Sequence, residues 1–360
     1  MTVDYGQILR ADGSVAIPLD ISPGKRGRNP GPAAIAHADT PGANSPDSPD
    51  SSDSSDPGLR AQWATRRRYM EAHNEKRLPD GRRRMRRFPL FKFLIERLGT
   101  VLKASGVYRR GLRNAVRIKL NRMEFTFDDL PESFDGYTIL HLTDLHVDGL
   151  PDGIGHLAEL VRGVPVDACV LTGDYRFNIR GPFDAILSPM QELVDAVSAR
   201  DGIYGVLGNH DSVEMMEPFE KLGIRMLANE TLSLARGDDR VHLTGIDDVH
   251  YYYSVHSLEA LRSTPDGFNI ALVHSPEIVE HAAAAGISLY LTGHTHGGQI
   301  CLPGGRPIIT NIAARRAYAT GSWRCDGMAG YTSPGAGISG LPVRYFSKSE
   351  AALITLKRRA

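Results

Sequence analysis

The chain has 360 residues, of which 41% are hydrophobic, and its formal net charge is zero. This length allows one large catalytic domain with residues left over for tails. Three scattered cysteines, Cys169, Cys301 and Cys325, are too few for a disulfide framework or a zinc knuckle, so we expect reduced thiols. The first residues lack the pattern of a cleaved signal, and no apolar run reaches the length of about 18 residues that a membrane span needs. We therefore predict a cytoplasmic protein without a membrane span.

Charge is distributed unevenly along the chain. Residues 1–60 are rich in Pro, Gly, Ser and Asp, and their low hydrophobicity predicts a disordered tail. Residues 61–122 form a basic segment. Counted from Arg60 to Arg122, 20 Lys and Arg stand against 4 Asp and Glu, a balance of +16. Such asymmetry suggests contact with a polyanionic surface.

Apolar side chains recur at helical spacing within the basic segment and predict an amphipathic helix. They are Phe91, Leu94, Ile95, Leu98, Val101 and Leu102. One interpretation is a helix that packs on the folded domain and keeps its charges in solvent. The other is a helix that lies in the plane of an anionic membrane, because basic residues beside an apolar stripe fit headgroups and acyl chains. Both interpretations fit the stripe.

Short β-rich apolar runs alternate with helix-like segments in the remainder of the chain. The runs end in polar residues and cover 137–144, 166–174, 202–211, 241–248, 268–275 and 287–296. Each predicts a buried strand whose C-terminal end delivers Asp, Asn or His to a loop. Helical patterns intervene at Phe183–Ala199 and Pro276–Ala285, and further strands and hairpins are expected in the last third. The fold class is therefore α/β.

Residue types that bind metal ions follow these predicted strands repeatedly. Divalent cations take carboxylate, imidazole and amide-oxygen ligands from rigid backbone. Five segments supply such residues, namely Asp144 with His146, Asp174, Asn209 with His210 and Asp211, His274, and His294 with His296. Gly173 lets the backbone turn sharply before the carboxylate that follows it. One histidine at a strand end is usually structural, but the conjunction of five such segments indicates a metal site.

This order of motifs resembles the calcineurin-like metallophosphoesterase family. The matching residues are DLH (144–146), GD (173–174), GNHD (208–211), His274 and GHTH (293–296). The resemblance implies a four-layer fold, a β-sandwich flanked by helices, for a catalytic domain over residues 123–360. It also implies two divalent ions, Mn, Fe or Zn, in a cleft at the strand ends. Asp144, His146, Asp174 and His296 would hold the first ion, and Asp174 would bridge to a second ion completed by Asn209, His274 and His294.

The same resemblance implies catalytic roles for His210 and Asp211. His210 would face the leaving group and stabilise its charge or donate a proton to it, and Asp211 would steady His210. The ions would activate a water and clamp the phosphate oxygens, so no covalent intermediate with the protein is expected. One departure is visible. The family commonly has a second acid three residues after the bridging Asp, and this chain has Phe177 there.

Other features near these motifs have less specific interpretations. Tyr251, Tyr252 and Tyr253 would either wall a substrate pocket or pack at an edge. The glycine-rich PGGR (303–306) would form a lip over the metals, and it is no phosphate loop, because neither Lys-Ser/Thr nor a helix follows it. The histidines outside the motifs are interpreted as structural or surface residues, and they are His141, His156, His242, His250, His256 and His281.

The segments 293–300 and 333–346 look like the membrane-associated branch of the family, which includes a UDP-2,3-diacylglucosamine pyrophosphatase. By this analogy the protein would hydrolyse a phosphodiester or pyrophosphate in a lipid-linked or nucleotide-linked substrate at a membrane surface. Expected partners are that substrate and an anionic membrane, reached through residues 60–122 from the inner face of the cell membrane. No specific nucleic acid is expected. Alternatives are a phosphodiesterase of soluble nucleotides, cyclic ones included, and a metal-binding scaffold without catalysis, against which the intact His210 and ligand set argue.

Overall fold

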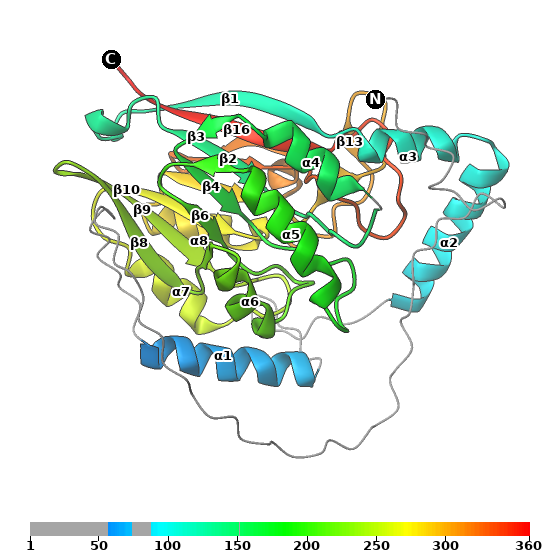
Figure 1. Ribbon diagram of the computed structural model, residues 1–360, viewed down its shortest axis with the longest axis horizontal. Helices are drawn as coiled ribbons and strands as arrows, with labels where there is room; N and C mark the ends of the chain where they lie inside the picture. The colour runs from blue at the N-terminus through cyan, green and yellow to red at the C-terminus, as the bar shows by residue number, and fades with distance from the viewer. Residues whose placement is uncertain (1–56, 74–87, 151) are drawn as a thin grey trace. The chain divides into compact units, whose positions relative to one another are not determined.

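Two six-stranded β-sheets form the centre of the protein, and a computed structural model describes residues 57–73, 88–150 and 152–360 (Figure 1). Nearly all of the expected tail, 1–60, and the arginine-rich stretch 82–87 lie outside the described residues. The first sheet has the order β1 (Lys119–Phe127), β16 (Glu350–Arg358), β2 (Thr138–Leu142), β4 (Ala168–Leu171), β6 (Ile203–Gly205) and β7 (Ile224–Met226). The second has the order β14 (Gly321–Cys325), β15 (Met328–Thr332), β11 (Leu289–Thr292), β10 (Phe268–Val273), β9 (Asp239–Ile246) and β8 (Glu230–Arg236).

Helices and two small sheets complete the described elements. β12 (Cys301–Leu302) pairs with β13 (Arg306–Pro307), and β3 (Pro165–Val166) pairs with β5 (Ser198–Ala199). The α-helices are α1 (Pro57–Ala72), α2 (Phe88–Ala104), α3 (Tyr108–Val116), α4 (Gly153–Val161), α5 (Asp184–Ala196), α6 (Met216–Lys221), α7 (Val255–Arg262) and α8 (Val279–Ala284). Single 3-10 turns are η2 (Glu132–Phe134), η3 (Val213–Met215), η4 (Pro276–Ile278), η5 (His296–Gly298) and η6 (Arg316–Tyr318).

Both faces of the central strands are buried. In β4, Ala168 and Val170 point into the space between the two sheets, whereas Cys169 and Leu171 pack outward against helices. Strand β10 repeats this alternation in the second sheet. Because successive side chains of a strand point to opposite faces, a strand that is covered on both sides reads as a continuous apolar run. This double burial explains the apolar runs in the sequence.

Helices cover the outer face of each sheet. α4, α5 and α6 pack on the first sheet, and α7 and α8 pack on the second. α5 buries Ile186, Met190 and Leu193, whose spacing of four and three residues places them on one side of the helix. The layers therefore follow the order helix, sheet, sheet, helix. This order confirms the predicted α/β fold with a β-sandwich flanked by helices.

Parallel pairing brings the ends of the central strands together. β2 pairs with β4 and β4 pairs with β6, while β9 pairs with β10 and β10 pairs with β11, and all of these pairs are parallel. The carboxyl ends of the strands in each set therefore meet at one edge of their sheet. The loops that leave these ends carry the predicted metal-binding residues.

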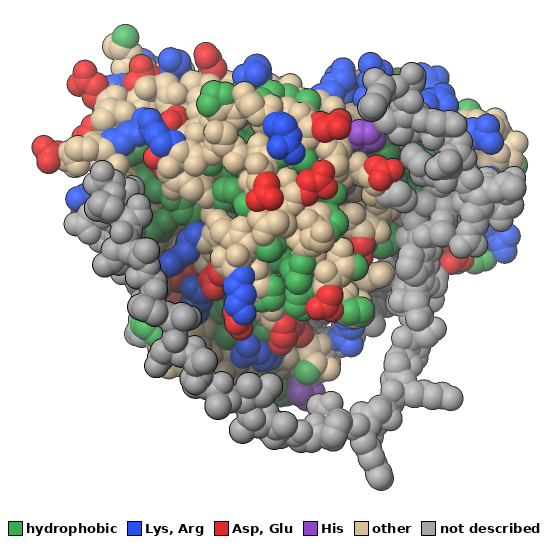
Figure 2. All heavy atoms as spheres, in the orientation of Figure 1, with side chains coloured by type: hydrophobic (Ala, Val, Ile, Leu, Met, Phe, Trp, Pro, Cys, Tyr) green, Lys and Arg blue, Asp and Glu red, His purple; other side chains and the backbone are tan. Residues whose placement is uncertain are grey.

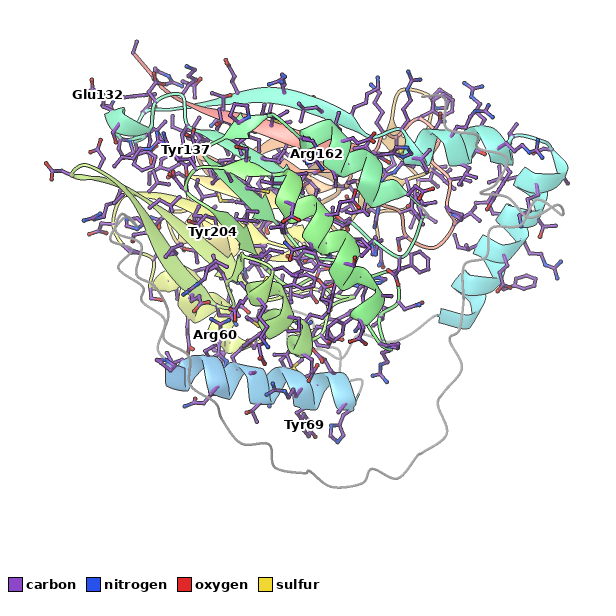
Figure 3. All side chains as sticks on the ribbon, viewed as in Figure 1. Arg60, Tyr69, Glu132, Tyr137, Arg162 and Tyr204 are labelled. Atoms are coloured by element: carbon purple, nitrogen blue, oxygen red, sulfur yellow. The ribbon has the colours of Figure 1, made fainter. Side chains whose placement is uncertain are left out.

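The expected basic segment, residues 61–122, contributes directly to the folded domain. β1 begins at Lys119, before the expected domain start at residue 123, and pairs along its length with β16. α1 turns one side to the domain, where Arg60 contacts Glu220, and its Tyr69 lies exposed on the opposite side (Figure 3). Part of the positive charge in this segment is therefore neutralised within the protein.

The amphipathic helix predicted within 91–102 is present as α2. Its Phe93, Leu98 and Val101 side chains are exposed, whereas Gly99 lies against Leu341. Lys and Arg side chains gather nearby over α3 (Figure 2). No helix in the described part of the chain combines the length and the apolar character needed to cross a bilayer.

Candidate metal centre

Loops that follow five strands bring the predicted ligands into one buried cluster. Two ligands follow β2, one follows β4, one follows β6, one follows β10 and two follow β11. All of them are buried. In this order they are Asp144, His146, Asp174, Asn209, His274, His294 and His296.

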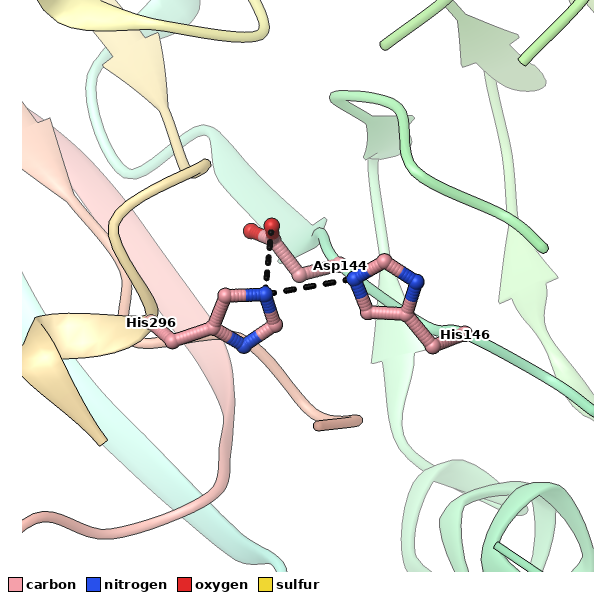
Figure 4. A group of neighbouring side chains, drawn as sticks. All are labelled: Asp144, His146 and His296. Carbon is pink, nitrogen blue, oxygen red and sulfur yellow. Dashed lines mark hydrogen bonds and ion pairs between the residues drawn. The ribbon is translucent and has the colours of Figure 1, made fainter. Parts of the chain in front are cut away.

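The first group consists of Asp144, His146 and His296 (Figure 4). Nε2 of His296 lies 3.3 Å from Oδ1 of Asp144 and 3.2 Å from Nε2 of His146. Both neighbours point toward the same imidazole nitrogen from the loop after β2. Three donor atoms at these separations can reach one cation without a movement of the backbone.

The second group consists of Asp174, His274 and His294, with Asn209 beside them. Nε2 of His274 lies 3.3 Å from Oδ2 of Asp174, 3.2 Å from Oδ1 of Asn209 and 3.3 Å from Nδ1 of His294. The same Asp174 oxygen also lies 3.7 Å from Nε2 of His146, in the first group. Asp174 therefore stands between the two groups.

Backbone carbonyl groups orient three of these imidazoles. His146 donates through Nδ1 to the carbonyl of Arg176 at 2.8 Å, and His274 donates through Nδ1 to the carbonyl of Thr172 at 2.7 Å. His294 uses its other nitrogen, Nε2, which lies 3.3 Å from the carbonyl oxygen of Asn311. Each ring thus turns its remaining nitrogen into the site, and in the deprotonated ring this nitrogen carries the lone pair that metal-binding histidines use.

The donor set fits a divalent cation. Oδ1 of Asp144 is buried and accepts no hydrogen bond from the described residues, although it lies 3.3 Å from His296. Burial, with a contribution from His210, lowers the pKa of His146, and burial together with His146 lowers the pKa of His296. Both rings are therefore neutral near pH 7. A cation between them would satisfy nitrogen lone pairs and a carboxylate oxygen that otherwise face one another.

Asp174 carries the negative charge at the centre of the cluster. Burial alone would raise its pKa, but the imidazoles of His274 and His210 together hold the pKa well below its usual value. Burial would likewise lower the pKa of His274, but Asp174 raises it to about 10. A bound cation would compete with the proton on His274, because an imidazole must lose that proton before it can coordinate.

Strained backbone marks the same residues. Asp144, His146, Asp174, His294 and His296 all have positive φ values, between 38° and 70°. Non-glycine residues rarely adopt this region, and such residues cluster at active sites. Gly173, with φ of 89°, makes the turn that the sequence indicated, and a Cβ on Gly293 would overlap the Asp144 carboxylate. The close approach of the loops depends on these two glycines.

His210 lies at the edge of the cluster and is less buried than the seven ligand candidates. Its Nδ1 donates to the carbonyl of Phe177 at 2.5 Å, which leaves Nε2 facing Asp174 Oδ2 at 3.9 Å. Phe177 occupies the position where the family commonly has an acid. Here its backbone, rather than a carboxylate, orients the histidine.

Asp211, which was expected to steady the His210 ring, lies directly after it in the tight turn that follows β6. Its carboxylate accepts hydrogen bonds from the backbone N–H groups of Gly208, Asp174 and Tyr175 at 2.7, 2.8 and 2.9 Å. It therefore ties the loop after β6 to the loop after β4. The tight turn directs this carboxylate toward the neighbouring strand end.

The loop after β9 carries residues whose place in the site the sequence did not reveal. His250, interpreted as structural or surface, is fully buried, and its ring centroid lies 3.9 Å from that of His294. Its Nδ1 lies 2.8 Å from Oε1 of Glu277. Asp248 accepts hydrogen bonds from the backbone of this loop, and burial raises its pKa to about 6. The only signal was the position of the GIDD motif (245–248) at the end of a predicted strand.

Arg67 and Trp63 of α1 also reach the loop after β9. No local pattern in the sequence predicted this contact. Both side chains hydrogen-bond to Asp247, at 2.5 Å from Arg67 and 2.7 Å from Trp63. Tyr252 packs beside them with Met70 and Tyr251 in a small buried cluster. Of the two interpretations of the tyrosine run, packing therefore holds for Tyr251 and Tyr252.

The PGGR segment (303–306) forms the turn between β12 and β13. After β13 the chain passes through Ile308 and Ile309, which are half exposed, to Asn311, whose carbonyl lies at His294. The hairpin is therefore joined to the second group of ligands by a short stretch of backbone.

Comparison with known proteins agrees with this geometry. Residues 137–298 match the family model described as calcineurin-like phosphoesterase. The metallophosphoesterase YkuE of Bacillus subtilis is 30% identical over 63% of this chain and 82% of its own length. YkoQ of the same organism is 29% identical over 66% of this chain and 90% of its own length. A transmembrane protein with a metallophosphoesterase domain from Danio rerio is 29% identical over 69% of this chain and 60% of its own length.

The matched region contains the strand ends from β2 to β11, and with them all seven buried ligand candidates. The family model, the relatives and the paired clusters of imidazole and carboxylate groups agree on the chemistry. The chain belongs to the calcineurin-like metallophosphoesterase family and is a metal-dependent phosphoesterase.

Proposed function

We propose that this enzyme hydrolyses a phosphodiester or pyrophosphate bond in a lipid-linked or nucleotide-linked substrate at a membrane surface, with two divalent ions. The position of Asp174 between two groups of ligand atoms is the observation that supports two bound ions. Asp144, His146, Asp174 and His296 would hold one ion, and Asp174, Asn209, His274 and His294 would hold the other. Mn, Fe and Zn all accept such ligands.

Two bound ions would supply an activated water and would neutralise the phosphate oxygens. The protein supplies the orientation. His210 presents Nε2 toward the site while its Nδ1 is held by the carbonyl of Phe177. In its protonated form this ring would stabilise charge on the leaving oxygen or donate a proton to it.

Exposed apolar side chains support the proposal that the enzyme acts at a membrane surface. Among the described residues, most of the large apolar side chains that are exposed lie in two regions. One comprises α2 and Val107 just before α3, and the other comprises the β12–β13 hairpin, the two residues that follow it, and Phe346. Tyr345 joins the two, because its hydroxyl donates to the carbonyl of Val107 while its own carbonyl accepts from the N–H of Cys301. The exposed residues are Phe93, Leu98, Val101, Val107, Leu302, Ile308, Ile309 and Phe346.

Charge around these residues suits an anionic lipid surface. Residues 297–323, which include the hairpin, contain three arginines and no Asp or Glu. α3 adds the exposed Arg109, Arg110 and Arg113. Basic residues beside exposed apolar side chains are typical of proteins that bind the membrane interface. Arg60 and Arg67 of α1 do not contribute to this surface, because they pair with carboxylates of the domain.

The Danio rerio relative is named as a transmembrane protein. If this chain also acts at a membrane, the exposed hairpin next to His294 would bring the metal site close to lipid headgroups. A lipid-linked diphosphate of the UDP-2,3-diacylglucosamine type is the substrate that we would test first.

A panel of phosphodiesters and pyrophosphates, soluble and vesicle-borne, tests the proposal with metal-reconstituted protein. We expect faster hydrolysis of the vesicle-borne substrates and co-sedimentation with anionic vesicles. The double variant Ile308→Ser, Ile309→Ser should weaken vesicle binding by about tenfold or more, since a buried aliphatic side chain contributes roughly 1.5 kcal/mol or more. Val255→Ser is the matched control, because Val255 is exposed on α7. If soluble and vesicle-borne substrates were hydrolysed at equal rates and the protein did not bind vesicles, the result would support the soluble-nucleotide alternative.

A further inference from the structure

Arg67 is a buried arginine that reaches from α1 into the loops of the metal centre. Its side chain is 1% exposed. Nη1 donates to Oδ1 of Asp247 at 2.5 Å. Nη2 donates to the carbonyl oxygens of Gly208 at 3.2 Å and of Asp211 at 2.9 Å. One guanidinium group therefore joins the GNHD loop after β6 to the GIDD loop after β9.

The surroundings of Arg67 fix its geometry. Nε donates to Oε1 of Glu71 at 2.7 Å, and the guanidinium carbon lies 3.5 Å from the centroid of the Tyr252 ring. Trp63 donates to the second oxygen of Asp247. Burial alone would lower the pKa of Arg67, but Asp247 and Glu71 raise it, so the group stays charged. A planar guanidinium with ion pairs, hydrogen bonds and a stacked ring holds its partners in one orientation.

The two carbonyl groups that Arg67 holds lie on either side of Asn209 and His210 in the chain. Oδ1 of Asn209 lies 3.2 Å from the His274 ring, and Nε2 of His210 faces Asp174. A group that fixes both ends of this short turn limits where its two central side chains can point. Misplacement of such groups by about 1 Å can cost roughly 100-fold in rate.

We propose that Arg67 is a positioning residue of the phosphoesterase site, which sets Asn209 and His210 through the carbonyl groups of Gly208 and Asp211. α1 is then part of the catalytic unit, although it precedes the region that matches the family model. The inference rests on the proposed roles of Asn209 as a ligand and His210 as a donor to the leaving group.

The test compares Arg67→Lys and Arg67→Ala in the full chain with two control variants. Arg68→Ala removes a neighbouring arginine that is 56% exposed and pairs with Glu214. Trp63→Phe removes a hydrogen bond to Asp247 but leaves the carbonyl contacts of Arg67 in place. For each variant we would measure kcat and KM for an alkyl and a nitrophenyl phosphodiester, the metal content, and the Tm of the metal-free protein.

Arg67→Ala should lower kcat by about 10–100-fold, and by more for the alkyl ester than for the nitrophenyl ester. Arg67→Lys should keep most of the Tm, because an ammonium group can still pair with Asp247. It should not restore kcat, since its single charged centre lacks the fork that reaches both carbonyls and the carboxylate. Trp63→Phe should lower the Tm with kcat within about twofold, because Arg67 retains its loop contacts. Arg68→Ala should have the same kcat and the same Tm as the unmodified protein.

The inference would be overturned if Arg67→Lys hydrolysed both esters with the kcat of the unmodified protein. It would also be overturned if Arg67→Ala changed only the Tm. His210→Ala, measured in parallel, separates this result from the proposed function. If His210→Ala slows both esters equally, the donor role of His210 fails. A loss of bound metal in Arg67→Ala would still reveal positioning of Asn209.

Discussion

Asp174 is the residue on which the cluster depends. Its carboxylate is buried, lies within 4 Å of three imidazoles, and also accepts a hydrogen bond from the N–H of His210. A single charged oxygen in that position can be shared between two cations, which no other carboxylate among the ligand candidates is placed to do.

Asp174→Asn should therefore lower the bound metal and reduce phosphodiester hydrolysis by more than about 100-fold. That loss exceeds the 10–100-fold typical of groups that only orient a ligand. Metal analysis after gel filtration measures the bound metal of the variant, and a rate assay measures its phosphodiester hydrolysis. The control is Asp195→Asn, an exposed position on α5. Unchanged stoichiometry and rate in Asp174→Asn would falsify the bridging role.

His210→Ala should slow an alkyl phosphodiester by about 10²–10⁴-fold and a nitrophenyl ester much less. An alkoxide leaving group accumulates more negative charge in the transition state than an aryl oxide, and so depends more on a donor. Metal content should stay nearly intact, because the ring lies beside the ligand groups and is held by the carbonyl of Phe177. Loss of an ion would instead make His210 a ligand.

At the scale of elements, α2, α3 and the β12–β13 hairpin together present basic and apolar side chains on exposed surface. Each basic residue near an anionic membrane contributes about 1 kcal/mol, and salt screens this attraction. The apolar contribution does not depend on salt in this way. The two contributions can therefore be separated by experiment.

Binding to anionic vesicles should weaken as salt rises, and binding to neutral vesicles should be weak throughout. Arg109→Gln with Arg110→Gln should reduce the salt dependence, because two exposed charges are lost from α3. Arg324→Gln is the control, since Arg324 is exposed on β14 outside the proposed surface. Co-sedimentation over a salt series measures the effect. Binding that ignores salt in the unmodified protein would contradict an electrostatic contribution.

At the scale of the whole molecule, the metal site joins the two sheets. Ligands from β2, β4 and β6 come from the first sheet, and those from β10 and β11 come from the second. An ion bound by the native state alone stabilises it by about 2.7 kcal/mol at a concentration 100 times its Kd.

Removal of metal by a chelator should therefore lower the Tm, and Mn²⁺ or Zn²⁺ should restore it. Calorimetry with and without the ion measures the shift. In Asp174→Asn the added ion should produce a smaller shift, because the shared oxygen is gone. An equal shift in both proteins would place the stabilising ion elsewhere in the molecule.

The sequence by itself determined the alternation of strands and helices and the identity of the ligand candidates. These features depend on local periodicity, since a doubly covered strand must be apolar throughout and its polar residues must follow its end. The six predicted strands appear as β2, β4, β6, β9, β10 and β11, with α5 and α8 between them. Asp144, His274 and His294 were found because each follows such a run.

Only the tertiary structure decided which distant groups meet around the ligands. Arg67 and Asp247 are 180 positions apart, and no periodicity in α1 indicates a buried arginine. The contact of His250 with His294 and the turn of the Asp211 carboxylate toward Asp174 and Tyr175 likewise depend on how loops from different strands pack. Local patterns record whether a side chain is buried, whereas the partner of a buried polar group is selected when the elements dock.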